Sequence, residues 1–97
     1  MADPPVILDE DGLLRRGSRW VAIPAGMALV VQLLLEQVGT AVPLEQVTAA
    51  YVAAGGTLNR KAVRTALARL RRRIAPLGLE LESIGQRSVA LRVGPQQ

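Results

Sequence analysis

Two residue types that carry much of protein chemistry are missing from this sequence of 97 residues, which has no cysteine and no histidine. Their absence excludes disulfides, thiol nucleophiles and the common zinc clusters, and it removes the side chain that most often moves protons near neutral pH. No pair of a nucleophile and a base is evident among the other residues. The sequence therefore predicts a protein that is not an enzyme and that needs no metal or cofactor.

Aromatic residues and long apolar runs are also scarce. Trp20 and Tyr51 are the two aromatic residues, which makes an aromatic platform for stacking nucleic-acid bases a poor interpretation. The most apolar segment, 21–35, is interrupted by Pro24 and Gly26 and is too short to span a bilayer. The N-terminus lacks the basic start and the apolar run of a signal peptide. We expect a cytoplasmic protein.

The apolar residues that are present suffice for one core. Hydrophobic residues make up 49% of the chain, which is typical of a globular protein and not of a disordered tail. The length suits a single domain, and no internal repeat is visible. We expect one domain over 1–97, with an ordered core at about 6–93.

Positive charge is concentrated in one segment, "NRKAVRTALARLRRR" (59–73), which carries seven cations and no acid. The cations are Arg60, Lys61, Arg64, Arg69, Arg71, Arg72 and Arg73. Because the whole chain nets +4, the remaining residues sum to −3. Such segregation is harder to explain by solubility than a uniformly basic surface would be. Three of the acids, Asp9, Glu10 and Asp11, stand together, and we interpret them as a polar turn in preference to a metal-binding loop.

The pattern of apolar residues predicts an α+β fold. We expect strands over 6–9, 13–16 and 19–23, which form a small antiparallel sheet. Helices are expected from Pro24 to Gly39, from Pro43 to the loop 53–57, and from the N-cap Asn59 to Pro76. Strands over 79–84 and 89–93 follow, joined by the turn 85–88. Three helices followed by a hairpin is the order of a winged helix-turn-helix, with the hairpin as the wing.

The same spacing predicts which side chains are buried. In the first helix the expected core positions are Met27, Val30, Val31, Leu34, Leu35 and Val38. In the third helix they are Val63, Leu67, Leu70 and Ile74, and in the last strand Val89, Leu91 and Val93. The third helix should therefore turn its cations to solvent.

The cations of the third helix oppose helix stability, which suggests an external anion. Arg60 and Lys61 lie at the end where the helix dipole favours acids, and Arg60–Arg64 and Arg69–Arg73 are like-charge pairs four residues apart. A merely solvated face and a membrane-bound helix are the alternatives. Phosphates of a DNA duplex supply a dense row of negative charge, and we favour double-stranded DNA as the partner.

Position along the helix suggests separate roles in DNA binding. Lys61, Arg64, Thr65 and Ala68 are predicted to reach base edges in the major groove. Arg69, Arg71, Arg72 and Arg73 are predicted to contact phosphates, and Arg60 belongs to the same surface. Arg87 lies in the hairpin turn, where it either enters the minor groove or is an ordinary exposed turn residue.

The chain also resembles a known family, the winged-helix effector domains of OmpR/PhoB-type response regulators. The resemblance rests on "VAIP" (21–24), on "GTAVPLEQV" (39–47), and on a third-helix pattern carried by Lys61, Val63, Leu67, Leu70, Arg71 and Ile74. It covers 6–93. The turn "GQRSV" (85–89) departs from the family's wing, and the loop "AAGGT" (53–57) is short and uncharged where the family's loop can contact RNA polymerase.

These observations predict a bacterial, stand-alone DNA-binding protein that acts in transcription regulation or as a nucleoid-associated factor. No receiver domain precedes the segment in this sequence, so phosphorylation is not the expected switch. Pairing of the protein with itself, as a dimer or in tandem, and contact with RNA polymerase stay open as further partners. The rival interpretation is an adaptor that docks an acidic protein of the transcription machinery. Loss of Arg87 should weaken a DNA reader but not an adaptor that uses the third helix alone.

Overall fold

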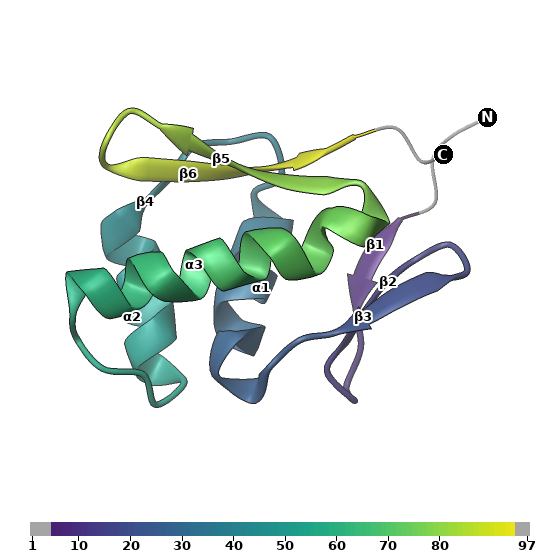
Figure 1. Ribbon diagram of the computed structural model, residues 1–97, viewed down its shortest axis with the longest axis horizontal. Coiled ribbons are helices and arrows are strands. Elements are labelled where there is room, and N and C mark those ends of the chain that lie inside the picture. The colour runs from purple at the N-terminus through teal and green to yellow at the C-terminus, as the bar shows by residue number, and fades with distance from the viewer. Residues whose placement is uncertain (1–4, 95–97) are drawn as a thin grey trace.

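The computed structural model describes residues 5–94, which form two small antiparallel sheets and three α-helices (Figure 1). The N-terminal sheet has the order β1-β2-β3, with β1 (Val6–Leu8), β2 (Leu13–Arg16) and β3 (Arg19–Ala22). A short 3₁₀ turn, η1 (Ala25–Met27), then leads into α1 (Ala28–Glu36). The predicted meander is therefore confirmed to within one residue at each strand.

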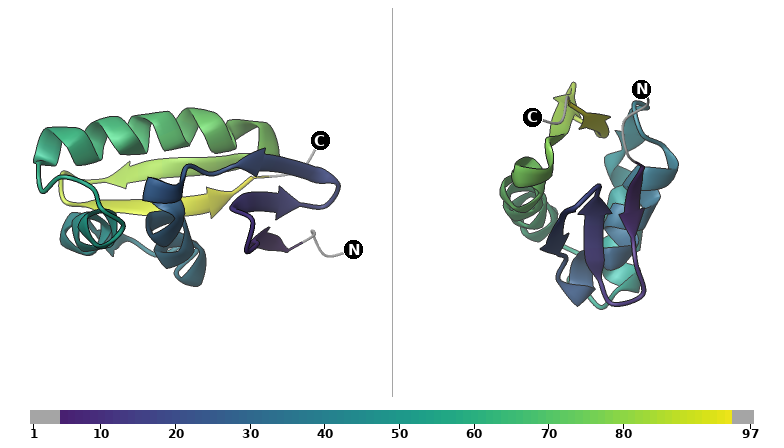
Figure 2. Two further views of the ribbon diagram at one scale, coloured as in Figure 1. Left: turned by 90° about the horizontal axis from the view of Figure 1, so that it is seen from below. Right: turned by 90° about the vertical axis from the view of Figure 1, so that its right-hand side faces the viewer.

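The helix-turn-helix and the wing follow in the expected order. The pair of helices is α2 (Leu44–Ala53) and α3 (Arg60–Ile74), and a 3₁₀ turn, η2 (Ala75–Leu77), closes α3. The wing is the hairpin of β5 (Leu79–Ile84) and β6 (Ser88–Val93), paired from Leu79↔Val93 to Ile84↔Ser88. Figure 2, left, places this hairpin between α3 on one side and α1 and α2 on the other.

One strand was not predicted. Residues 40–42 were interpreted as a connection and Pro43 as the start of the second helix, but β4 (Val42–Pro43) pairs with β6 through Val42↔Val89 and Pro43↔Ser88. A strand of two residues has no alternation to detect, and its partners in β6 are 45 and 47 positions away in the sequence. The consequence is that the first turn of α2 is fixed beside the wing.

The core confirms the predicted faces of α3 and most of that of α1. Val63, Leu67, Leu70 and Ile74 of α3 are all buried, as are Met27, Val30, Val31 and Leu34 at the start of the chain's first helix. Two predictions of burial are wrong. Val38 lies beyond the end of α1, which stops at Glu36 and not at Gly39, and it is exposed. Val93 lies at the open end of the hairpin, and it is 39% exposed.

The turn between α2 and α3 depends on two glycines. Gly55 has a φ of 97°, a left-handed conformation that other residues rarely adopt. A Cβ atom on Gly56 would lie 2.4 Å from the Tyr51 ring, so only glycine lets the chain pass so close to that ring. The paired glycines therefore set the angle at which α3 leaves α2.

Arginine side chains tie the N-terminal sheet to the end of α3. Arg16 is fully buried, and its Nη1 and Nη2 donate to Leu77 O at 2.7 Å and to Gly94 O at 2.6 Å. Arg19 Nη1 donates to Pro76 O at 3.1 Å, and Arg73 Nη1 donates to Ala22 O at 3.3 Å. All four acceptors are backbone carbonyls, of which Pro76 and Leu77 follow α3, Gly94 follows β6 and Ala22 belongs to β3. This function of Arg16 was not predicted from the sequence, because burial of an arginine is rare.

The acidic residues between β1 and β2 form a turn, as predicted. Asp9 Oδ1 accepts hydrogen bonds from the backbone N–H groups of Asp11 and Leu13, both at 2.9 Å, and Asp9 Oδ2 accepts from Arg15 Nε at 2.8 Å. The hydrogen bond from Arg15 is the main cause that lowers the pKa of Asp9, and the bond from Leu13 adds to it. Both carboxylate oxygens of Asp9 thus accept hydrogen bonds from this turn and from β2, which follows it.

No helix within residues 5–94 is both long enough and apolar enough to cross a membrane.

Candidate nucleic-acid interface

The N-terminal end of α3 is fixed by its capping residue. Asn59 has an extended backbone, and its Oδ1 accepts from Lys61 N at 2.8 Å and from Ala62 N at 3.2 Å. These bonds satisfy two of the donors that a helix leaves unpaired at its start. The cap holds the first turn of α3, with Arg60 and Lys61, in a defined position.

Replacing Asn59 by alanine removes both bonds and should lower the free energy of unfolding by about 1 kcal/mol. Chemical denaturation followed by circular dichroism measures this difference. Asn59→Asp is the matched control, because aspartate accepts the same bonds and adds a negative charge that the helix dipole favours at this end. A cap that contributes nothing would leave all three proteins equally stable.

The cations of α3 divide into two groups by their bonding. Arg71 Nε donates to Leu81 O at 3.0 Å and Arg73 Nη1 donates to Ala22 O, so these two guanidinium groups hold the protein's own backbone. The other cations of α3, together with Arg87 of the wing turn, make no side-chain hydrogen bond or ion pair within the described residues 5–94. They are Arg60, Lys61, Arg64, Arg69, Arg72 and Arg87, all of them exposed.

The predicted base-reading residues lie on the exposed side of α3. Lys61, Thr65 and Ala68 are exposed, and they lie opposite the buried stripe that begins at Val63. Arg72 continues the same face toward the C-terminal end. This face carries small side chains at its centre and cations at its ends, and has no acid in α3 beside it.

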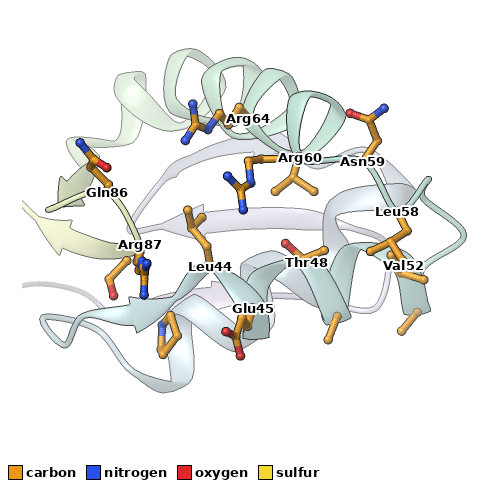
Figure 3. Close-up of a pocket in the computed structure, with 15 residues that line it drawn as sticks. Leu44, Glu45, Thr48, Val52, Leu58, Asn59, Arg60, Arg64, Gln86 and Arg87 are labelled. Atoms are coloured by element: carbon orange, nitrogen blue, oxygen red, sulfur yellow. The ribbon is translucent and has the colours of Figure 1, made fainter.

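A second group of predicted residues borders a cleft between α2, α3 and the wing (Figure 3). Arg60 and Arg64 come from α3, and Arg87 from the wing turn. In Figure 3 Arg60 reaches toward Leu44 of α2, whereas Arg64 leans toward the wing. The cleft has a volume of about 1250 Å³, above the roughly 300–1,000 Å³ of most small-molecule pockets.

The backbone holds the wing turn against this cleft. Leu44 N, at the start of α2, donates to Arg87 O at 2.7 Å. The wing turn has only three residues between the paired strands, because Ile84 pairs with Ser88. Arg87 is therefore an exposed side chain on an anchored backbone, and the structure brings it to the same cleft as Arg60 and Arg64.

The cleft also contains residues that were not singled out from the sequence. Glu45 is the one acid among its lining residues, and it lies in the first turn of α2, where the helix dipole favours a negative charge. Leu44, Val52 and Leu58 add apolar surface, and Leu58 is 78% exposed. No local pattern marks these residues, because the cleft forms only when the distant wing turn packs beside α2 and α3.

Comparisons with known proteins rest on structure alone. No model of a protein family matches the sequence, and no curated protein matches it significantly. Among solved structures, the chain is similar to the C-terminal domain of the nisin resistance regulator NsrR, described as a lantibiotic response regulator. The match has a TM-score of 0.78 and covers 95% of each chain, at 18% sequence identity. The predicted fold is confirmed: the chain has the winged-helix fold of a response regulator's C-terminal domain.

Proposed function

We propose that this protein binds double-stranded DNA, with α3 in the major groove, and regulates transcription or organises the nucleoid. One observation carries the proposal. Six exposed cations on α3 and the wing turn make no side-chain hydrogen bond or ion pair within residues 5–94. Arg60, Arg64 and Arg87 lie where α2, α3 and the wing meet (Figure 3), and the other three cations lie along α3.

The energetics of α3 support an anionic partner. Arg60 and Lys61 occupy the first turn, where the dipole disfavours cations, and Arg60–Arg64 is a like-charge pair. Each conflict costs a few tenths of a kcal/mol. No acid within the described chain forms an ion pair with these cations. Phosphate oxygens would relieve all of these conflicts together.

Geometry suggests how the roles divide. Lys61, Thr65 and Ala68 are exposed along α3 from its first turn to its middle, as a base-reading surface requires. Arg69 and Arg72 are suited to phosphates beside it. Arg71 and Arg73 hold backbone carbonyls through Nε and Nη1 respectively, so we assign them chiefly to the position of α3, although each retains further N–H donors.

Arg60, Arg64 and Arg87 border the cleft from two different elements. A phosphodiester strand passing between α3 and the wing would meet all three. Arg64 lies at the rim of the cleft, where its guanidinium group is able to bond either a base edge or a phosphate. Arg87 would then act from an anchored wing turn, beside the start of α2.

The similarity to NsrR supports the regulatory part of the proposal, because the matching domain comes from a protein described as a response regulator. At 18% identity the likeness does not extend to the DNA sequence that is bound. The target site and the sign of regulation therefore depend on residues of this chain.

An adaptor function is the second candidate, and the apolar part of the cleft favours it. Leu58 is 78% exposed and Val52 is 38% exposed, next to Arg60. An acidic segment of a transcription-machinery protein could place apolar side chains there and carboxylates on the arginines. The two candidates make different predictions for Arg69 and Arg72, which do not line the cleft. Loss of these two arginines should weaken binding to DNA but not binding to an acidic protein segment in the cleft.

Fluorescence anisotropy with a labelled duplex of random sequence, titrated at several salt concentrations, tests the proposal. If about five phosphates are contacted, the logarithm of the association constant should fall with a slope near −4 to −5 against the logarithm of salt concentration. A protein that does not bind the duplex even at low salt would contradict DNA binding and support the adaptor.

A further inference from the structure

The N-terminal sheet has one face on the core and one face in solvent. Because side chains alternate along a strand, Leu14 and Arg16 of β2 point inward and are buried, with Val6 and Leu8 of β1 on the same side. The inner face needs no further partner. The opposite face remains open along all three strands.

Two large apolar side chains project from this outer face. Ile7 is 53% exposed and Trp20 is 56% exposed. The strand register places Ile7 opposite Arg15 and Arg15 opposite Trp20, so the three residues form one row across β1, β2 and β3. Leu13 and Ala22 form a second row beside it. Trp20 is the only tryptophan of the chain, and an exposed tryptophan is a frequent centre of protein interfaces.

We propose that this outer sheet face is a self-association surface, on which two copies of the chain pair about a twofold axis parallel to β2. Such an axis places Ile7 of one copy over Trp20 of the other, and the reverse contact follows by symmetry. The face is thus complementary to itself, with an aliphatic residue on one edge strand and an aromatic residue on the other.

The charges of the face favour a second copy over a nucleic acid or a strongly charged protein. Among the residues of these two rows Arg15 is the only charged one, and its Nε bonds Asp9 Oδ2 at 2.8 Å. The face is therefore close to neutral at its centre. Its one ion pair can be shared with the corresponding pair of the other copy, whereas phosphates or a cationic partner would find no net charge to oppose.

The position of the face is compatible with DNA binding by the same molecule. Figures 1 and 2 show the N-terminal sheet at one end of the protein and the wing turn with the start of α3 at the other. Pairing through the sheets would leave both α3 helices accessible. Two copies held on neighbouring half-sites would meet at a raised effective concentration.

The size of the face predicts weak association in free solution. Three strands about 4.8 Å apart and four residues of about 3.3 Å each span roughly 15 Å by 13 Å. The accessible area on such a face falls short of the roughly 800 Å² per partner of a stable interface. We therefore expect monomers in dilute solution and dimers at high concentration.

Trp20 is a built-in reporter for the test. Sedimentation equilibrium and tryptophan emission are measured together on the full chain, without DNA, from about 10 µM to about 1 mM, the range of weak interfaces. The weight-average mass should rise toward that of two chains. Over the same concentrations the emission should shift to shorter wavelength, because the indole leaves water.

Variants locate the surface. Ile7→Asp should keep the protein monomeric, and its tryptophan emission should stay at the wavelength of a solvent-exposed indole. Trp20→Ser should abolish the rise in weight-average mass. Leu58→Ser is the matched control, since Leu58 is the more exposed residue but lies on the cleft, and it should associate like the wild type. Circular dichroism confirms that each variant is folded.

A wild-type mass that stays monomeric to about 1 mM with unshifted emission would overturn the proposal, as would association that survives both sheet variants. Neither outcome bears on DNA binding, which is measured separately.

Discussion

Alanine at Lys61, Arg64 and Arg72 together should abolish detectable duplex binding while leaving the protein folded. All three side chains are exposed on α3, and none makes a side-chain bond within residues 5–94. Each contact to a base or a phosphate contributes on the order of 1–2 kcal/mol, so we expect a loss of roughly 10²- to 10⁴-fold in affinity. Stability should hardly change, because exposed residues without partners contribute little to it. Relief of like-charge repulsion with Arg60 would even favour the variant.

The anisotropy titration measures this loss, and a charge-matched control separates a local interface from bulk charge. The control replaces Arg15, Arg19 and Arg92 by alanine, which removes three cations that lie in the N-terminal sheet and in β6. It should bind the duplex almost as well as the wild type at moderate salt. Equal losses in both triple variants would mean that net charge alone drives binding, and full affinity in the α3 variant would refute the interface.

The same titration distinguishes base-reading from phosphate-binding residues. A phosphate contact such as that proposed for Arg72 should change the salt slope by about one unit and weaken all duplexes alike. A base contact such as that proposed for Lys61 should instead reduce the preference among sequences. For Arg71, whose Nε donates to Leu81 O, we expect a smaller change in slope than for Arg72.

Arg16→Ala should be the most destabilising single substitution considered, with a loss of about 2–4 kcal/mol in the free energy of unfolding. Arg16 is fully buried, and it donates to Leu77 O and Gly94 O at 2.7 and 2.6 Å. Alanine would break both charge-assisted bonds, leave the buried Leu77 carbonyl without this donor, and open a cavity between the N-terminal sheet and the end of the wing. A domain of this size has a total stability of only about 5–15 kcal/mol.

Urea denaturation followed by circular dichroism measures the effect, with Arg15→Ala as the control. Arg15 is the neighbouring residue on the exposed face and bonds only Asp9 in the described chain, so its loss should be much smaller. Equal stabilities of the two variants would show that Arg16 does not join the sheet to the rest of the fold. DNA binding by folded Arg16→Ala should persist at low temperature, because the residue is remote from the cleft.

Local patterns determined a large part of this protein. The spacing of Val63, Leu67, Leu70 and Ile74 predicted α3 and its buried face, because a helix brings residues three and four apart to one side. Asn59 was identified as the cap from its side chain alone, and it makes the expected bonds. The order of elements then predicted the winged-helix fold. The helix, its buried face and its cap each depend on residues that are close together in the chain, so they can be predicted from the sequence.

Tertiary structure decided what depends on distant segments. The pairing of β4 with β6, the cleft shared by Arg60, Arg64 and Arg87, and the burial of Arg16 all join residues that are tens of positions apart. The charge of Arg71 and Arg73 was visible in the sequence, but their backbone acceptors, Leu81 O and Ala22 O, were not. A periodic pattern records which side of an element faces the core. It does not record which backbone carbonyl lies within reach of a guanidinium group, because that depends on how the elements pack.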